Sequence, residues 1–524
     1  MDYFKTLQQR LNGLQRAIIV CDKKVSINLC SQIATQYPNL WIDWVWQDLP
    51  NDANNHILSK LQNPRGISIY HLQEKQQLWL FSGRLNTLPE HFFGQKIINL
   101  SNNKLSEQII ADNSNSKTRP WFSLPEKVAV ENVIVIGAGI AGAATAYALA
   151  RRGVHVQVIS DKPIATAASG NKQGLLYAKI SAQDTMQTRL LLQSYGYTRG
   201  LLDNLLSKDF WSDCGVLHLD DGKAESKRNQ QLSQQPNNLY HYINAQEASQ
   251  LAGIPLDKGG LYWQYGAWIH PPVLVKKLLS HPNIQVIDNI RINLLNRQNQ
   301  YWQLIDTAGK EYYATHIVLC CGADRMLNDS LGLNMQVIRG QTDCALATDF
   351  SGRLKIALSG KSYISPAWNE THCFGATFIP NDDNDEIREY DSQVNYQNLS
   401  LLHKQLSDEL TFPADYTHAA VRIDAYDHLP VVGSVGDAKQ MRKIYSHLAF
   451  DKKYPYTTEC PYLQGLYINS AHGTRGLCTA PLCGEAVAAE ILGLPYPFNN
   501  SLRQALSPNR LIVHDLVYNK NRYL

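Results

Sequence analysis

Three glycines with a fixed spacing are the residues of this 524-residue chain whose chemistry is easiest to name. Gly137, Gly139 and Gly142 form the pattern G-x-G-x-x-G. The first glycine permits a tight turn, the second lets a pyrophosphate approach the backbone, and the third lets a helix pack closely on the preceding strand. Ile140 follows the second glycine, where the free N–H groups of a new helix would attract phosphate. The spacing therefore predicts a dinucleotide-phosphate site.

The residues around the glycines predict the elements that would hold this site. Residues 133–136 are apolar and β-branched, an alanine-rich helical stretch follows the glycines, and residues 154–160 form a second strand-like run. Strand, helix and strand at these distances make a βαβ unit. Ser160 stands where an acidic ribose-binding residue is usual, so the neighbouring Asp161 is the acidic candidate.

Two other interpretations of this segment stay open on the sequence alone. Residues 132–150 carry no charge and are mostly apolar, which could indicate a membrane span. The glycines at the joint between a β-branched part and a small-residue part favour strand, turn and helix instead. The second alternative is a Rossmann-like turn that binds no nucleotide.

The composition argues against several classes of protein. Apolar residues make up 44% and charged residues 18%, as in globular proteins, and no signal peptide is evident, so we expect a cytoplasmic protein. The ten cysteines form no C-x-x-C pair, which predicts reduced thiols and no metal site. A net charge of +3 does not by itself indicate nucleic acid. The basic residues Arg503, Arg510, Lys520 and Arg522 form either a solvated tail or an edge that contacts phosphate.

The pattern along the chain predicts two main parts. Residues 1–100 alternate short apolar runs with polar stretches, as in a small α/β domain, and residues 101–120 have the composition of a linker. After residue 120, two sets of strand-like segments interleave. We expect an α/β (α+β) fold, with a Rossmann-like nucleotide domain interleaved with an antiparallel-sheet substrate domain and preceded by the small N-terminal domain. The nucleotide parts are predicted at about 131–205, 270–330 and 420–524, and the substrate-sheet parts at about 206–269 and 331–419.

Further segments resemble those of a known superfamily. Residues 314–323 (ATHIVLCCGA) form an apolar run ending at Gly322, residues 338–341 are IRGQ, and residues 465–492 read as strand, glycine-bounded loop and helix. With the glycine motif, they resemble the nucleotide-contacting segments of FAD enzymes of the D-amino-acid oxidase and glycine oxidase superfamily. The resemblance implies that the last helix points its positive end at the flavin.

A narrower resemblance rests on four more motifs: ASGNKQGLL (168–176), VRIDAYDHLPVVG (421–433), TRGLCTAPLCGE (474–485) and LSPNRL (506–511). Together they closely resemble the FAD-dependent C-terminal half of the MnmC family of bifunctional bacterial tRNA-modification proteins, from about Trp121 to the C-terminus. That family's other half is a methyltransferase. Here the preceding 120 residues are about half as long as expected and lack a glycine-rich methyl-donor loop. We expect a different or degenerate N-terminal domain, and no methyl transfer.

The resemblance implies an FAD-dependent oxidoreductase that acts on a CH–NH group. In the family, this half removes the carboxymethyl group of 5-carboxymethylaminomethyl-(2-thio)uridine at the tRNA wobble position as glyoxylate and leaves 5-aminomethyl-(2-thio)uridine. The partner is then tRNA, with no membrane and with a separate methyltransferase as a further partner. The expected FAD-binding residues are Gly137, Gly139, Ile140, Gly142, Asp161, Ser169, Gly170, Lys172, Gln173, Gly174, Gly322, Gly473, Gly476 and Leu477.

The substrate carboxylate requires a cation, for which an arginine that binds both oxygens is best suited. Arg422 and Arg475 lie in matched motifs and are the first candidates, and Arg339 is the third. For each of them an ion pair or a cofactor contact is an equal alternative. Further candidates for the active site are His472, Tyr363, His428 and Tyr177, for which structural roles are the alternative.

Two other functions stay open. One is a small-molecule glycine, amino-acid or secondary-amine oxidase, and the other is a non-catalytic RNA-binding module that keeps a flavin fold. The family-specific motifs favour tRNA modification over the first, and the intact glycines argue against the second.

Overall fold

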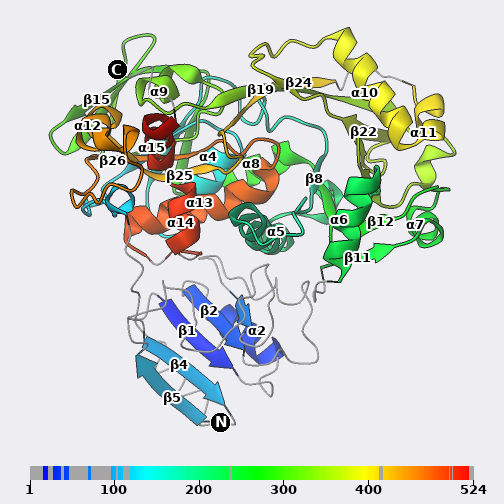
Figure 1. Cartoon of the computed structure of the whole chain (residues 1–524), viewed down its shortest axis with the longest axis horizontal. Helices are drawn as coiled ribbons and strands as arrows, with labels where there is room; N and C mark the ends of the chain where they lie inside the picture. The colour runs from blue at the N-terminus through cyan, green and yellow to red at the C-terminus, as the bar shows by residue number, and fades with distance from the viewer. Residues whose placement is uncertain are drawn as a thin grey trace.

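The computed structural model describes residues 119–234, 239–411, 417–494, 496–498 and 500–518, and in the N-terminal part residues 16–21, 27–36, 41–46, 69–71, 96–101 and 104–109. Figure 1 shows three groups of elements: an N-terminal sheet, a central α/β part and a large sheet flanked by helices. Of the described helices, none is long and apolar enough to cross a membrane.

The central part is built on a six-stranded sheet whose strand order is β14-β7-β6-β18-β26-β25. All pairs are parallel except β25 with β26. In chain order the strands are β6 (Val133–Ile136), β7 (Val156–Ile159), β14 (Ile284–Ile287), β18 (His316–Leu319), β25 (Val431–Gly436) and β26 (Tyr462–Ser470). Strand β6 has β7 on one side and β18 on the other, and such a switch point leaves a crevice at the carboxyl ends of the strands.

Helices cover this sheet and pack on one another. The main ones are α4 (Ile140–Ala150), α5 (Met186–Leu205), α8 (Pro271–Leu279) and α13 (Gly476–Leu492). Helices α4 and α13 cross where Gly484 faces Ala144, and a Cβ at Gly484 would lie 2.9 Å from the Ala144 carbonyl carbon. Small residues along both helices therefore allow their backbones to approach closely.

The large sheet has nine strands in the order β11-β12-β10-β20-β21-β22-β19-β23, with β24 paired to β19. In chain order they are β10 (Val216–Leu219), β11 (Tyr240–Ile243), β12 (Gly260–Trp263), β19 (Gln336–Leu346), β20 (Ala357–Ser359), β21 (Tyr363–Ile364), β22 (Thr371–Gly375), β23 (Ile379–Pro380) and β24 (His418–Asp424). The pairs are antiparallel, as expected, except that β10 and β20 run parallel. The flanking helices are α6 (Lys223–Ser233), α7 (Ala245–Ala252), α10 (Glu389–Leu402) and α11 (Lys404–Glu409).

The chain alternates between the two sheets, which confirms the predicted fold class. The exact division into parts stays a prediction. Strand β24 falls mostly in a predicted nucleotide part, but it pairs with β19 of the large sheet from Gln336↔Asp424 to Thr342↔His418. Backbone pairing, which composition does not reveal, carries this strand from one sheet to the other.

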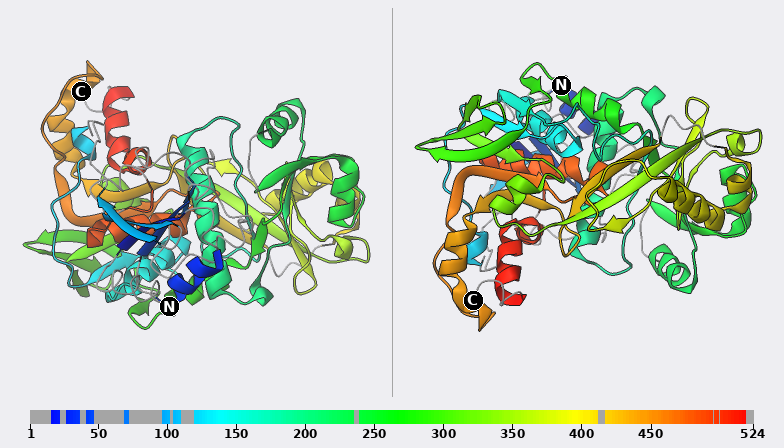
Figure 2. Two further views of the ribbon diagram at one scale, coloured as in Figure 1. Left: turned by 90° about the horizontal axis from the view of Figure 1, so that it is seen from below. Right: turned by 90° about the horizontal axis from the view of Figure 1, so that it is seen from above.

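Smaller elements complete the described part of the chain. Two three-stranded sheets contain β8 (Gly174–Leu176), β9 (Trp211–Ser212) and β13 (Ala267–Ile269), and β15 (Ile292–Gln298), β16 (Tyr301–Asp306) and β17 (Glu311–Ala314). Short helices are η3 (Pro120–Phe122), η4 (Lys208–Phe210), α9 (Arg325–Ser330), η5 (Ser351–Arg353), α12 (Ala438–Ile444), η7 (Ser446–Ala449) and α14 (Asn500–Leu506). The last helix is α15 (Asn509–Tyr518). Both views of Figure 2 place α12 and α15 at the opposite end of the molecule from α10.

The N-terminal part is a five-stranded sheet in the order β3-β2-β1-β4-β5. Its elements are β1 (Arg16–Cys21), α2 (Ile27–Gln36), β2 (Trp41–Trp46), β3 (Ile69–His71), β4 (Lys96–Ser101) and β5 (Lys104–Ile109). Strand β5 lies inside the stretch that we predicted to be a linker, and it pairs antiparallel with β4. The linker prediction is therefore wrong for residues 104–109, because a polar strand on a sheet edge has the composition of a linker.

Candidate active site

A cavity of about 610 Å³ opens where the strands of the six-stranded sheet end. Residues that follow β6, β7, β18 and β26 form its wall together with residues of β20, β21 and β24. Most of the predicted site residues line it, namely Gly137, Gly139, Ile140, Asp161, Ser169, Gly174, Gly322, Tyr363, Arg422, His472, Gly473, Arg475, Gly476 and Leu477. Four of the expected FAD-binding residues, Gly142, Gly170, Lys172 and Gln173, are not part of its wall.

The glycine turn after β6 is packed so closely that side chains are excluded. Gly137 has a φ of +112°, and a Cβ there would lie 2.3 Å from the carbonyl oxygen of Cys320. A Cβ at Gly142 would lie 1.8 Å from the carbonyl oxygen of Gly137. Gly142 therefore serves the close packing of α4 on the turn, which is the reason for which a third glycine is needed.

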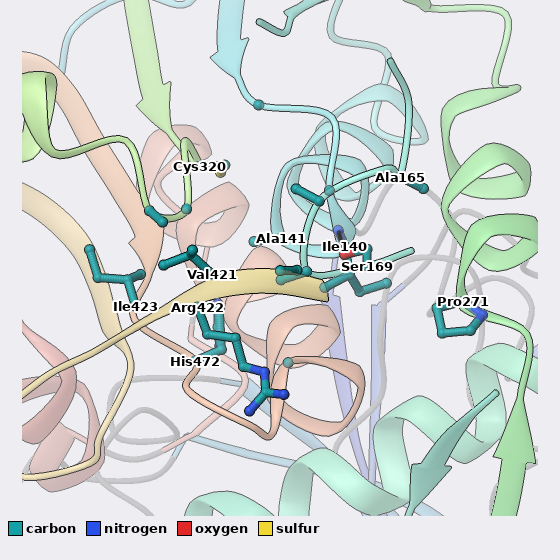
Figure 3. Close-up of a pocket in the computed structure, with 18 of the residues that line it drawn as sticks. Ile140, Ala141, Ala165, Ser169, Pro271, Cys320, Val421, Arg422, Ile423 and His472 are labelled. Carbon is teal, nitrogen blue, oxygen red and sulfur yellow. Dashed lines mark hydrogen bonds between the residues drawn. The ribbon is translucent and has the colours of Figure 1, made fainter. Parts of the chain in front are cut away.

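The loop between β7 and β8 lies across this turn. The Ile140 amide at the start of α4 donates a hydrogen bond to Ser169 Oγ at 3.0 Å, and the Ala165 amide donates to the Ala138 carbonyl at 3.2 Å. Figure 3 shows Ile140 and Ser169 side by side. One of the free amides at the start of α4 is thus bound by Ser169, while Ala141 also lines the cavity.

The ASGNKQG segment continues from Ser169 along the edge of the cavity. Gly170 lies against His418, whose ring would be 2.6 Å from a Cβ at this position, and Gly174 lies against Leu477 of α13. Gln173 is fully buried, and its Nε2 donates to the Pro366 carbonyl at 3.1 Å. Gly170 and Gln173 thus hold the loop in place from behind the cavity wall.

Two helices begin at the cavity. Ile140 and Ala141 at the start of α4 and Gly476 and Leu477 at the start of α13 line it. Positive ends of helix dipoles attract anionic groups. Gly322 after β18 has a φ of +53°, and no atom lies within 4 Å of a Cβ built there. Open space beside a glycine, two helix starts and the acidic Asp161 after β7 suit a dinucleotide.

His472 links the two helices. Its Nε2 lies 3.0 Å from Asn469 Oδ1 and its Nδ1 lies 2.9 Å from Thr479 Oγ1, while Asn469 Nδ2 donates to Thr145 Oγ1 of α4 at 3.0 Å. Burial lowers the pKa of His472 to about 3. The imidazole is therefore neutral with both nitrogens engaged, which favours the structural alternative over acid–base chemistry for this residue.

Arg422 projects from β24 into the cavity, as Figure 3 shows. A Cβ at Gly340 of the IRGQ segment would lie 2.0 Å from Arg422 Nη2, so the glycine makes room for the guanidinium. Burial lowers the pKa of Arg422, and Tyr363 opposes that shift. Within the described part of the chain, the Arg422 guanidinium has neither a hydrogen bond nor an ion pair. A partly desolvated cation without a partner is costly, so an anionic ligand would stabilise it.

Arg475, Tyr363 and Tyr177 complete the polar wall. Arg475 is the N-cap of α13, and the described residues provide no hydrogen bond or ion pair for its side chain. The Tyr363 hydroxyl lies 3.9 Å from Cys373 Sγ, and the Tyr177 hydroxyl lies 2.7 Å from Ser359 Oγ. Burial raises the pKa of both tyrosines, so both phenols keep their protons.

Two further candidates from the sequence, Arg339 and His428, lie outside the cavity wall. Arg339 is fully buried, and its guanidinium binds Asp391, Gln341 and the Asn384 carbonyl. Its proposed role in carboxylate binding is therefore wrong, because its donors are used inside the protein. Exposed His428 pairs with Asp424 at 2.7 Å.

The basic C-terminal stretch is only partly described, because Lys520 and Arg522 lie outside the described residues. Arg510 is buried and binds both oxygens of Asp427, and Arg503 donates to the Phe122 carbonyl. For Arg510, neither a solvated tail nor a phosphate-contacting edge is correct, whereas for the half-buried Arg503 both stay predictions.

Sequence reasoning missed several residues of the cavity wall. Lys179, Arg291 and Ser359 line it but belong to no motif. Ser359 comes from the parallel pair β10–β20, in which it lies opposite His218. No sequence signal predicts this register, because short strands distant in sequence meet only in the folded sheet.

Comparisons with known proteins agree with this geometry. A family model described as "FAD dependent oxidoreductase" (DAO) matches residues 132–490. The chain is 39% identical over 413 residues to the "tRNA 5-methylaminomethyl-2-thiouridine biosynthesis bifunctional protein MnmC" of Chromobacterium violaceum, which covers 76% of this chain and 62% of that protein. It is 35% identical over 408 residues to the protein of the same name from Stutzerimonas stutzeri, with the same coverage. The chain thus spans less than two thirds of the length of these relatives.

Solved structures share the fold. Glycine oxidase from Geobacillus kaustophilus has a TM-score of 0.59 and 18% identity, covering 72% of this chain and 97% of that one. Iminodiacetate oxidase from Chelativorans has a TM-score of 0.56 and 19% identity, covering 70% of this chain and 96% of that one. The resemblance to MnmC proteins is confirmed, FAD is the cofactor, and the chain belongs to the DAO family of FAD-dependent oxidoreductases.

Proposed function

We propose that this protein removes the carboxymethyl group from 5-carboxymethylaminomethyl-(2-thio)uridine at the wobble position of tRNA. The observation that carries the proposal is Arg422, a half-buried arginine whose guanidinium faces the cavity without a partner among the described residues. The curated relatives are named for biosynthesis of a modified tRNA uridine, which supports tRNA as the substrate.

The residues around the cavity would hold FAD at both ends. The glycine turn and the start of α4 would receive the diphosphate, Asp161 the ribose, and the start of α13 the negative charge of the reduced ring. When bound, FAD supplies the acceptor for a hydride from the carbon next to the amine.

The chain's own residues would position the substrate. Arg422 would bind the carboxylate through two parallel hydrogen bonds, which orients the carbon to be oxidised. Arg475 at the start of α13 provides a second cation, which would contact the substrate nucleotide. Oxidation of the CH–NH bond produces an imine, and water then hydrolyses the imine to glyoxylate and the aminomethyl product.

An exposed surface at the C-terminal end suits RNA. We call it the α12 surface; it consists of the exposed lysines Lys439, Lys443, Lys452 and Lys453 and the aromatic residues His447, Phe450 and Tyr454. Phe450 is 72% exposed, and His447 and Tyr454 have ring centroids 4.3 Å apart. Lysines bind phosphates and exposed rings stack on bases, so this combination supports an RNA partner.

Anaerobic mixing of the FAD-loaded protein with modified tRNA tests the proposal. We expect flavin absorbance to bleach in a single turnover with tRNA that carries the carboxymethylaminomethyl group, and glyoxylate to appear. Glycine and sarcosine should react far more slowly. Bleaching by glycine or sarcosine but not by tRNA would instead indicate a small-molecule amine oxidase.

Arg422→Met tests the carboxylate contact. Because the substrate would lose its charged partner, we expect kcat/KM for the modified tRNA to fall by roughly a hundredfold or more, while FAD content is retained. The matched control is Arg353→Met, which removes an arginine of η5 that does not line the cavity. Equal activity of the two variants would contradict the role of Arg422.

A further inference from the structure

A chain of four side chains runs from the cavity to the protein surface. Tyr177 and Ser359 line the cavity, and their oxygens are 2.7 Å apart. Ser359 Oγ lies 3.4 Å from His218 Nδ1, and His218 Nε2 lies 2.8 Å from Glu225 Oε2. The parallel pairing of β10 and β20 sets His218 beside Ser359, and Glu225 comes from α6.

Glu225, at the outer end of this series of side chains, can only accept hydrogen bonds. Although burial acts in the opposite direction, the hydrogen bond from His218 and the charges of Lys179 and Arg228 lower the pKa of Glu225. Lys179 Nζ and Arg228 Nη1 each lie 3.3 Å from Glu225 Oε1. Because an ionised carboxylate has no proton to donate, His218 Nε2 must carry a hydrogen and donate it.

Because His218 Nε2 donates to Glu225, the directions of the other hydrogen bonds in the series are also fixed. His218 is 2% exposed, and burial lowers its pKa, so the ring is neutral. A neutral imidazole with its hydrogen on Nε2 accepts at Nδ1, so the Ser359 hydroxyl donates to it. The Ser359 hydroxyl has a single hydrogen, and its oxygen therefore accepts the hydrogen of the Tyr177 phenol. The Tyr177 oxygen then has only lone pairs to offer to a ligand.

We propose that Tyr177 is the acceptor for the N–H of the substrate amine, and that Ser359, His218 and Glu225 are positioning residues that hold it in this orientation. The inference rests on the proposed function, because it assigns the partner of the amine that is oxidised. It divides the recognition between two groups: Arg422 for the carboxylate and Tyr177 for the amine. A ligand with an oxygen in place of the N–H would face the lone pairs of Tyr177 and be disfavoured.

Two small probes measure this preference. Sarcosine carries N–H groups, and methoxyacetate has an ether oxygen in the same place; both carry the carboxylate. Binding to the FAD-loaded protein is followed by the perturbation of the flavin spectrum. We expect the native protein to bind sarcosine at least about tenfold more tightly than methoxyacetate, the size of one missing hydrogen bond beside an unpaired acceptor. The sarcosine amine is also positively charged near neutral pH, so the change of this ratio in the variants, and not the ratio alone, isolates the hydrogen bond.

Substitutions in the four linked residues should change the ratio of the affinities for sarcosine and methoxyacetate. Tyr177→Phe removes the acceptor, and Ser359→Ala and Glu225→Gln free the phenol to donate into the cavity, so the ratio should fall several-fold in all three. Arg422→Met should weaken both probes alike and leave the ratio unchanged. Tyr242→Phe is the matched control, since the Tyr242 hydroxyl donates to Asp220 at 3.0 Å and does not line the cavity.

The inference would be overturned if the native protein showed no preference for sarcosine or bound neither probe. It would also be overturned if Ser359→Ala left the ratio of the sarcosine and methoxyacetate affinities unchanged. A protein that is not reduced by modified tRNA but shows the expected ratios would refute the proposed function and leave the role of Tyr177 intact. Reduction by tRNA with no difference between the probes would refute the role of Tyr177 alone.

Discussion

At the scale of single residues, the cavity depends on positions where a side chain would not fit. Gly139 bears most directly on the cofactor, because it lines the cavity and a Cβ there would lie 3.3 Å from Ser169 Oγ. A contact at this distance is tighter than ordinary van der Waals contact, so the Ser169 side chain would have to move. Larger atoms would then extend into the space that the diphosphate requires.

Gly139→Val should therefore abolish FAD retention. We expect flavin absorbance per protein to fall by more than about tenfold, because the valine methyl groups compete with the cofactor for the same volume. Gly352→Val is the control, since no atom lies within 4 Å of a Cβ at that glycine. Purified Gly139→Val protein with a full complement of flavin would contradict the assignment.

At the scale of elements, a buried ion cluster joins the helices that carry the two cavity-facing starts. Glu485 of α13 is 1% exposed and pairs with Arg151 and Arg152, which follow α4. The Tyr197 hydroxyl of α5 donates to Glu485 at 2.8 Å. Although burial opposes it, the two arginines lower the pKa of Glu485, so the carboxylate is ionised. The cluster holds α4, α5 and α13 in register behind the site.

Glu485→Ala should destabilise the protein by about 3–5 kcal/mol, because it removes the carboxylate that compensates the charges of two buried arginines. Denaturant unfolding of the FAD-free protein measures the free energy of unfolding. The exposed pair of Lys404 and Asp408 provides the control: Asp408→Ala should cost less than about 1 kcal/mol. Equal losses in the two variants would show that the cluster contributes no more than a surface pair.

The depressed pKa of Glu485 also gives the sign of a pH effect. A carboxylate whose pKa is lower in the folded state contributes stability above its unfolded pKa, and the contribution is lost as the pH falls through the folded value. The native protein should thus lose more stability on acidification than Glu485→Ala does.

At the scale of the whole molecule, catalysis and RNA binding would use different regions. The cavity lies between the two sheets, whereas the α12 surface lies at the end of the molecule opposite α10 (Figure 2). A tRNA whose wobble uridine enters the cavity would have to reach the α12 surface with another part of the molecule. Interactions far from the cavity would then contribute affinity for tRNA but not for small amines.

Lysines of the α12 surface should therefore affect tRNA affinity and its salt dependence. Lys452→Ala combined with Lys453→Ala should weaken tRNA binding and reduce the slope of log K against log salt by roughly 0.7–0.9 for each phosphate that the protein no longer neutralises. Filter binding at several salt concentrations measures both quantities. Lys404→Ala on α11 is the control, and sarcosine binding should be unaffected in either variant. An unchanged slope would remove this surface from the tRNA interface.

The sequence by itself determined the parts of the protein that depend on local spacing. The glycine motif, the strands on both sides of it and the helix that begins at Gly476 follow from residues close together in the chain. Family motifs also placed Arg422 and Arg475 in the site, where the structure brings both to one cavity. Local steric and hydrogen-bonding rules are sufficient for such features.

Only the tertiary structure decided which polar groups are left free for a ligand. Arg339 and Arg422 each take the second position of a family motif and look alike in sequence, yet Arg339 is bound to Asp391 while Arg422 faces the cavity. Tyr177 obtains its direction from His218 and Glu225 through a strand pairing between distant segments. Whether a buried polar group is satisfied depends on neighbours from the whole fold, and those neighbours are not adjacent in the chain.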